Sequence, residues 1–155
     1  MQTFKPKNGL ISNLLFVYLL LLAIPLIMLI NREPWDVFLK VTAINYGLVT
    51  LVLYIIQIST RYKIKDGNFH YRSLVFFGKI AIAKIHKLDV GKTLYVGMKP
   101  ATAKKGIIIH YNRYEEVYIS PEDNAAFVAA LLAINPAIEV HYHPKPKGIN
   151  KESLQ

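Results

Sequence analysis

Two long apolar runs occupy the first 60 residues of the chain. Residues 8–31 carry no charged side chain and include "ISNLLFVYLLLLAIPLIMLI", and residues 41–60 read "VTAINYGLVTLVLYIIQIST". About 20 helical residues at roughly 1.5 Å each reach about 30 Å, the thickness of the hydrocarbon core of a bilayer. The pattern predicts two membrane-spanning helices, over about residues 10–30 and 41–60, with a kink at Pro25 in the first.

Each run has a rival interpretation. A cleaved signal peptide would be shorter and would end at a small-x-small site, whereas the first run ends in "LINREPW". The second run contains Asn45 and Gln57, so it could also be a buried core helix, or these two side chains could hydrogen-bond to the partner helix. The connector, residues 31–40, is short, so two spanning helices must form an antiparallel hairpin.

The charges that flank the runs predict the orientation of this hairpin. Lys5 and Lys7 precede the first run, and Arg61, Lys63 and Lys65 follow the second, whereas the connector balances two basic against two acidic residues. Lys and Arg concentrate in the cytoplasmic flanks of membrane proteins. We therefore expect a multi-pass protein of the cytoplasmic (inner) membrane with both termini, and the domain that follows the runs, on the cytoplasmic side.

Residues 61–142 carry the pattern of a small β-rich domain. The expected strands cover residues 62–65, 69–77, 79–85, 106–111 and 116–120, with a further short strand near 93–96 after a bend. Asp66-Gly67-Asn68 predicts a tight hairpin turn, because Gly and Asn accept positive φ. Gly78 is expected to separate the second and third strands, and a turn is expected to begin at Asn112.

The stretch "YISPEDNAAFVAALLAINPAI" predicts one capped helix at the end of the domain. Ser120 is the expected N-cap, with Pro121 at the first helical position and Asp123 completing a capping box. An apolar helix face is expected from the spacing of three residues, and Asn135-Pro136 is expected to stop the helix. The three residues of that face are Phe127, Leu131 and Ile134.

The predicted fold class is therefore α+β. A two-helix transmembrane hairpin, residues 1–60, precedes a small antiparallel sheet or barrel, residues 61–142, that the helix closes, and residues 143–155 are expected to form a flexible tail.

This layout resembles the bacterial PH-like domains of the YyaB-like family over roughly residues 61–140. The signature I-S-P-x-[DE], an apolar helix and Asn-Pro is matched by Ile119, Ser120, Pro121, Asp123, Phe127, Leu131, Asn135 and Pro136. The resemblance implies a PH-like fold behind a hydrophobic N-terminal segment. The sequence departs from the family pattern at Lys104 and Lys105, which stand where an acid–arginine pair is expected.

Charge adds candidate binding residues. From Arg61 onward the chain has 15 Lys and Arg against 8 Asp and Glu, and a basic domain beside a membrane favours anionic lipid over nucleic acid. Eukaryotic PH domains bind phosphoinositide head groups with basic residues near the first hairpin, where His70 replaces a further base. The candidates for lipid or partner binding are Arg61, Lys63, Lys65, Arg72, Lys104 and Lys105.

No other chemistry is indicated. There is no cysteine, so disulfides and thiolate sites are excluded. His141 and His143 could share a strand face, but they are better explained as solvated than as metal ligands. We expect no catalysis, cofactor or bound metal.

The expected function is a membrane-anchored binding module that holds a protein or anionic-lipid partner. The alternative that the resemblance permits is an immunity-type protein that protects against a bacteriocin or toxin. The oligomeric state is not predicted.

Overall fold

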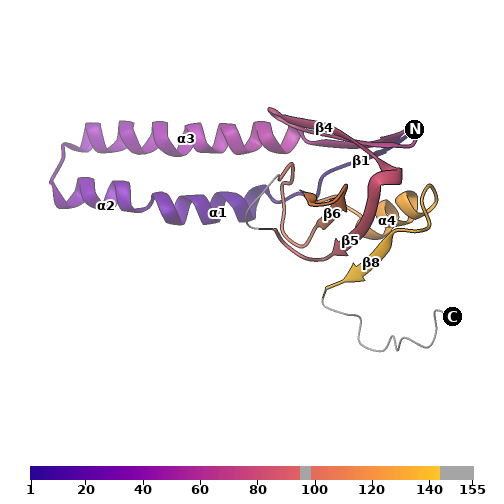
Figure 1. The fold of residues 1–155 in the computed structure, drawn as a ribbon. Helices are drawn as coiled ribbons and strands as arrows, with labels where there is room; N and C mark the ends of the chain where they lie inside the picture. Colours follow the sequence, from indigo (N-terminus) through magenta and orange to yellow (C-terminus); the bar gives the residue numbers. More distant parts are fainter. Residues whose placement is uncertain (95–98, 144–155) are drawn as a thin grey trace.

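A helical hairpin and a β-rich domain make up the protein (Figure 1). The computed structural model describes residues 1–94 and 99–143. The hairpin consists of α1 (Leu10–Leu21), α2 (Ala23–Ile30) and α3 (Trp35–Ser59). Because α3 begins at Trp35, the loop between the arms is shorter than the connector expected over residues 31–40.

The first arm of the hairpin is interrupted at Leu22, between α1 and α2. Pro25 has no N–H to donate to the carbonyl of Leu21, and its ring crowds that carbonyl, so the helical ladder breaks one turn before the proline. The interruption lies three residues before Pro25, the position at which the sequence predicts a kink.

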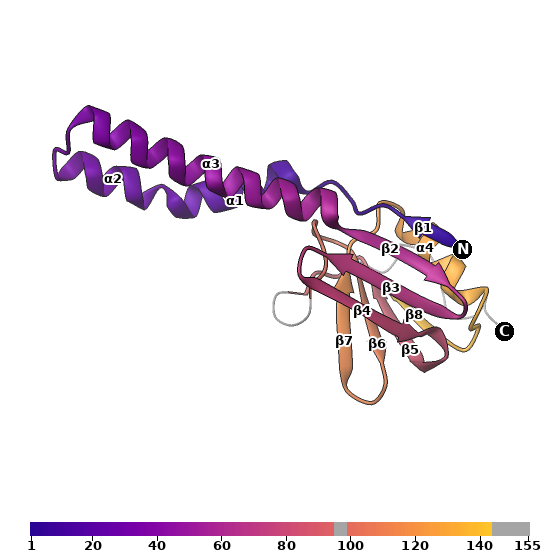
Figure 2. The ribbon, with the colours of Figure 1, turned by 90° about the horizontal axis from the view of Figure 1, so that it is seen from above.

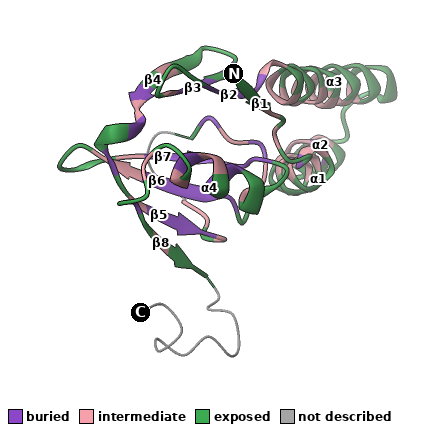
Figure 3. Ribbon diagram, turned by 90° about the vertical axis from the view of Figure 1, so that its right-hand side faces the viewer, coloured by how far each residue is buried: buried purple, intermediate pink, exposed green. Residues whose placement is uncertain are grey.

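Neither arm is buried in the protein. The two arms span 21 and 25 residues, and only 6% and 0% of their most apolar stretches are buried (Figure 3); exposed apolar side chains include Ile11, Leu19, Ile44 and Leu48. Burial in a soluble core, the rival interpretation of the second run, is not what the structure shows. Both arms are long enough and apolar enough to cross a membrane.

The first sheet has four antiparallel strands in the order β1-β2-β3-β4. These are β1 (Gln2–Phe4), β2 (Arg61–Lys65), β3 (Asn68–Ser73) and β4 (Phe76–Ala81). The sequence analysis missed β1, which precedes the hairpin and pairs with the strand that follows it, Thr3 lying opposite Lys63. The helical hairpin is thus inserted between two neighbouring strands of one sheet.

Two predicted strands are wrong. Residues 69–77 do not form one strand, because the chain turns at Leu74 and Val75, and Gly78 lies inside β4 opposite Tyr71. Residues 79–85 are divided between β4, a 3₁₀ turn (Ile82–Lys84) and the strand β5 (Ile85–Val90). The first turn escaped notice because Leu74 has φ +50°, a conformation that usually selects Gly, Asn or Asp. The predicted turn at Asp66-Gly67, with φ +51° and +69°, is confirmed.

The second sheet has the order β7-β6-β5-β8. Its strands are β5 (Ile85–Val90), β6 (Ile107–Tyr111), β7 (Glu115–Ile119) and β8 (Glu139–Tyr142), which runs parallel to β5. The strands β6 and β7 and the turn at Asn112 confirm the prediction. The bend that the sequence analysis expects before residues 93–96 does not begin at residue 86, because residues 86–90 continue the strand β5. Of the strand expected near 93–96, Thr93 and Leu94 are not in a strand, and the rest lies outside the described residues, as does the predicted tail from residue 144 onward.

The helix α4 (Asn124–Leu132) starts later than expected. Its N-cap is Asp123, whose Oδ1 accepts a hydrogen bond from the N–H of Ala126 at 2.9 Å. Ser120 is instead fully buried, and Pro121 forms a β-bridge with Pro6. The predicted cap at Ser120 is therefore wrong, because the serine is drawn into the core by other partners described below.

The core lies between the two sheets and α4. Phe127 on α4 makes edge-to-face contacts with Phe69 of β3 and Phe4 of β1, at centroid distances of 5.3 and 5.1 Å. Leu131 is also buried as expected, but Ile134 is 46% exposed, because α4 ends at Leu132 and the chain turns there. The α+β fold class is confirmed.

Candidate functional site

Basic side chains gather on the outer face of the first sheet. Side chains alternate along β2, so Tyr62 and Ile64 are buried while Arg61, Lys63 and Lys65 are exposed. The register sets Arg61 opposite Arg72 and Lys63 opposite His70, and Lys79 of β4 lies beside His70.

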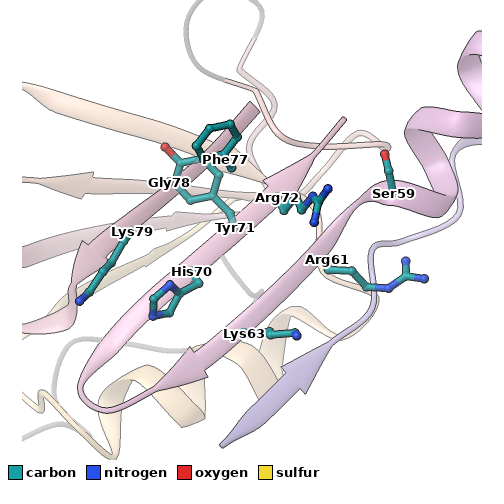
Figure 4. Close-up of a pocket in the computed structure, with 9 residues that line it drawn as sticks. All are labelled: Ser59, Arg61, Lys63, His70, Tyr71, Arg72, Phe77, Gly78 and Lys79. Atoms are coloured by element: carbon teal, nitrogen blue, oxygen red, sulfur yellow. The ribbon is translucent and has the colours of Figure 1, made fainter. Parts of the chain in front are cut away.

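These residues line an open hollow of about 630 Å³. We call it the basic hollow; it is lined by Ser59, Arg61, Lys63, His70, Tyr71, Arg72, Phe77, Gly78 and Lys79 (Figure 4). No carboxylate lines it among the residues that the structure describes. Four cationic side chains and a histidine without a counter-charge form a site suited to an anion.

Tyr71 and Gly78 are cross-strand neighbours in the strands that carry the basic hollow, and the side chain of Tyr71 is buried in the core behind it. The ring of Tyr71 passes so close to Gly78 that a Cβ there would lie 2.3 Å from the tyrosine hydroxyl. Burial, and secondarily the charge of Glu115, raises the pKa of Tyr71. The close approach explains why a glycine interrupts an otherwise regular strand.

One end of the basic hollow is fixed to the end of α3. Thr60 and Ser73 share a hydrogen bond between their hydroxyls at 2.8 Å, and the N–H of Leu74 donates to Ser59 Oγ at 3.0 Å. Figure 2 shows β2 leaving α3 in nearly the same direction. Arg61 and Arg72 therefore lie nearest to the helices, while Lys63 and His70 lie one step farther along the strands.

The sequence candidates fall into two groups. Arg61, Lys63 and Arg72 line the basic hollow, but Lys65 lies at the far end of β2 and pairs with Asp66 at 3.5 Å. Lys104 and Lys105 line a separate hollow beside the start of α1, together with Lys7.

The sequence analysis missed Ser59, Tyr71, Phe77, Gly78 and Lys79 as lining residues. Recognition of the turn at Leu74 would have placed Phe77 and Lys79 opposite Arg72 and His70, respectively. That turn lacks the usual residues, so the signal was absent from the sequence.

A network of hydrogen bonds ties both arms of the hairpin to the domain. Gln57 of α3 accepts from the N–H of Gly9 and donates to the carbonyl of Lys7, both at 3.4 Å. Asn13 of α1 donates to the carbonyl of Thr102 at 2.8 Å. The hydrogen bond expected for Gln57 is thus present, though its partner is the backbone that leads into α1.

Ser120 completes this network. Its Oγ accepts from the N–H groups of Thr102 and Ala103 at 2.9 and 3.1 Å, and its carbonyl accepts from the N–H of Lys7 at 2.7 Å. Tyr62 donates its hydroxyl to the carbonyl of Pro100 at 2.6 Å, and burial raises the pKa of this tyrosine to about 12. Hydrogen bonds therefore join the end of the domain that faces the helices to the hairpin and to the residues that lead into α1.

A second titratable cluster surrounds Asp89 on β5. His110 Nε2 lies 3.0 Å, Lys87 Nζ 3.4 Å and His143 Nε2 3.5 Å from its carboxylate. Burial raises the pKa of Asp89, but the hydrogen bond from His110 and the positive charge of Lys87 outweigh burial, so the pKa is lowered overall. The cluster therefore satisfies a buried carboxylate.

The histidines that could have shared a metal ion have different partners. His141 lies 3.6 Å from Glu139, whereas His143 lies beside Asp89. Within residues 1–94 and 99–143, no group of three or more His, Cys, Asp or Glu is arranged to hold a metal ion.

Comparisons with known proteins bear on the β-rich domain. No curated protein and no solved structure matches the chain. Residues 60–135 match the family model described as Bacterial PH domain, a stretch that runs from the end of α3 to the residues just after α4. This match and the fold together support a PH-like domain in this part of the chain.

Proposed function

We propose that this protein is a membrane-anchored PH-like module that binds anionic lipid head groups in the basic hollow, at the inner face of the cytoplasmic membrane. The observation that carries the proposal is the position of Arg61 and Arg72. They are cross-strand neighbours, and Arg61 lies two residues after the last residue of α3. Head-group phosphates of the adjacent leaflet would be their nearest anions.

Membrane anchoring is supported by the exposed apolar surface of the hairpin. Soluble monomers rarely expose apolar patches larger than a few hundred Å², whereas aliphatic side chains are exposed along the length of both arms. The basic flanks at Lys5, Lys7 and Arg61 favour a cytoplasmic position for the domain. Residues 1–9 are hydrogen-bonded to the domain, which supports a topology with both on the same side of the bilayer.

Distance separates the basic residues into near and far positions. A strand rises about 3.3 Å per residue, so Arg61 lies about 7 Å beyond Ser59 and Lys65 about 20 Å beyond it. The Debye length is about 8 Å at physiological salt. Because β2 leads away from α3, Arg61 and Arg72 dominate the attraction, and Lys65 contributes little.

The test uses the full chain in bilayers, because a piece that begins at residue 61 would lack β1 and the Phe4–Phe127 contact. Electron paramagnetic resonance of spin-labelled lipids measures how strongly anionic and zwitterionic phospholipids associate with the protein. We expect the wild-type protein to prefer the anionic lipid and the double variant Arg61→Gln/Arg72→Gln to lose about 1–2 kcal/mol of that preference. The preference should weaken as salt rises.

The matched control is Lys84→Gln/Arg113→Gln, which removes the same charge from exposed positions outside the basic hollow. It should keep the preference for anionic lipid. Equal loss in both double variants would mean that net charge alone attracts the lipid. No preference in the wild-type protein would overturn the proposal and leave a protein partner, or an immunity role exerted by the hairpin, to account for the function.

A further inference from the structure

The two-residue turn between β3 and β4 and the first two residues of β4 form an exposed apolar tip. Its four residues are 41, 70, 52 and 77% exposed, in the order Leu74, Val75, Phe76 and Phe77. We call these four residues the β3–β4 tip. Two-residue hairpin turns normally carry Asn, Asp or Gly, so both the composition and the exposure of this tip need a reason.

The β3–β4 tip lies beside the last turn of α3. The N–H of Leu74 donates to Ser59 Oγ, and Ser73, which precedes the tip, is hydrogen-bonded to Thr60. Ile58, immediately before Ser59, is itself an exposed apolar residue of α3. The apolar surface of the hairpin therefore continues onto the tip.

The direction of the strands points the β3–β4 tip toward the helices. The strand β3 runs antiparallel to β2, which leads away from α3, so β3 ends at the level where α3 ends. Figure 2 shows the turn between β3 and β4 level with the end of α3. If α3 crosses the bilayer to Ser59, the tip lies at the bilayer surface.

We propose that the β3–β4 tip inserts into the interfacial region of the bilayer beside α3 and fixes the orientation of the domain. The occupant of this apolar surface is lipid. Leucine, valine and phenylalanine gain free energy when they leave water, and Arg72, three residues before Val75, is placed at head-group level by the same insertion. The inference rests on the membrane anchoring proposed above, but it does not depend on the charge of the lipid.

The cost of the turn agrees with this role. Leu74 has φ +50°, a left-handed conformation that is unfavourable for a side chain with a Cβ. Features that break a local rule and persist are often functional. Here the strained conformation places an apolar residue beside the end of α3, at a position where a polar turn would be more stable.

The absence of cysteine allows a direct measurement of depth. Single nitroxide labels are attached to four variants of the full chain: Val75→Cys, Phe77→Cys, Lys79→Cys and Ala83→Cys. These positions run from the tip along β4 and past its end, in steps of about 7 Å between the first three. Collision with oxygen, which is concentrated in the bilayer, is compared with collision with a water-soluble nickel chelate.

We expect a gradient of depth. The label at Val75 should collide with the nickel chelate at least fivefold less than the label at Ala83, and the labels at Phe77 and Lys79 should fall in between, in that order. Ala83 is the matched control because it is exposed and lies at the opposite end of β4 from the tip. If Val75→Cys does not fold, the comparison of Phe77 with Ala83 decides the question.

The measurement is made in bilayers of zwitterionic lipid alone. A gradient there supports insertion whatever the outcome of the anionic-lipid test. Equal exposure of Val75, Phe77 and Ala83 to the nickel chelate overturns the insertion, even if anionic lipid still binds in the basic hollow. The two proposals can therefore fail separately.

Discussion

The two hairpin turns of the first sheet differ in residue composition and in their position relative to the helices. The β2–β3 turn has Asp66 and Gly67 at its centre, both with positive φ, and lies at the end of the sheet away from the helices. The β3–β4 turn has Leu74 and Val75 at its centre and lies beside α3. Asp-Gly is a preferred pair for a tight hairpin, whereas Leu-Val is not.

The residues of one turn suit its backbone conformation, whereas the residues of the other suit its proposed place beside the membrane. At the far end of the sheet the turn is built from residues that favour the required backbone conformation, and its surface is polar. At the helix-facing end the turn accepts an unfavourable conformation and exposes apolar side chains. Because both turns belong to the same sheet, the difference reflects their surroundings, which we propose to be water at one end and lipid at the other.

The largest effect is expected from a substitution in the core on which the first sheet packs. Phe127→Ala should lower the free energy of unfolding by about 3–5 kcal/mol, as for other buried aromatic residues, because Phe127 contacts Phe69 and Phe4. Chemical denaturation of the full chain in mild detergent, followed by near-ultraviolet circular dichroism, measures the loss. Ile134→Ala is the control, and it should cost less than about 1 kcal/mol because its side chain is half exposed. A loss below 1 kcal/mol for Phe127→Ala would contradict the packing of α4 on the sheets.

The next effect is specific to the helix-facing end. Ser120→Ala leaves the buried N–H of Thr102 and the partly buried N–H of Ala103 without their acceptor, so we expect a loss of about 2–3 kcal/mol. Asp123→Ala, which removes the true N-cap of α4, should cost about 1 kcal/mol. Hydrogen exchange locates each effect: Ser120→Ala should expose the amides of residues 102–103, and Asp123→Ala that of Ala126. Faster exchange at Ala126 in the Ser120→Ala variant would instead indicate that Ser120 is the N-cap of α4.

The fold could be predicted from the sequence where the local residues are typical of the structure they form, as in the β2–β3 turn, and not where they are atypical, as in the β3–β4 turn. The two long apolar helices, the Asp66-Gly67 turn and the strands β6 and β7 agree with the sequence analysis, because the apolar runs, hydrophobic periodicity and turn residues are clear there. The strand β1 was missed since three residues before an apolar run carry no period, and its partner β2 lies more than 50 residues away. The β3–β4 turn was missed because its residues are typical of a strand interior.

The candidate site was predicted in part for a related reason. Arg61, Lys63 and Arg72 were recognised from their proximity to the first hairpin, which local pattern reveals. Their grouping with Phe77 and Lys79 depends on the unrecognised turn, and the buried role of Ser120 depends on Thr102 and Ala103, a contact across the fold. Candidate residues could be identified from local sequence patterns, whereas contacts between residues distant in the sequence could not.

The turn at the far end should be sensitive to the loss of glycine. Gly67 has φ +69° and no atom within 4 Å of the position that a Cβ would take, so Gly67→Ala tests backbone conformation alone. We expect a loss of about 1–2 kcal/mol in the free energy of unfolding, from the cost of the left-handed region for alanine. The control is Gly47→Ala in α3, the same chemical change at a helical position with open space around it. It should not destabilise the protein, and equal losses at the two sites would remove the conformational explanation.

The smallest effect is expected from Leu74→Asn, which should be favourable in detergent and unfavourable in a bilayer. Leu74→Asn relieves much of the cost of φ +50°, because asparagine accepts this conformation better than leucine does. In detergent, where the tip is free of a fixed bilayer, the variant should be more stable than the wild-type protein by up to about 1 kcal/mol. In a bilayer the asparagine loses the apolar burial of leucine, so a nitroxide at Phe77 should become more accessible to the nickel chelate. The reciprocal change, Asp66→Leu at φ +51°, should destabilise the protein in both media, since that turn faces water. If Leu74→Asn destabilises the protein in detergent, the side chain of Leu74 contributes packing that outweighs its strain, and the tip would be part of the core rather than a surface shaped for lipid.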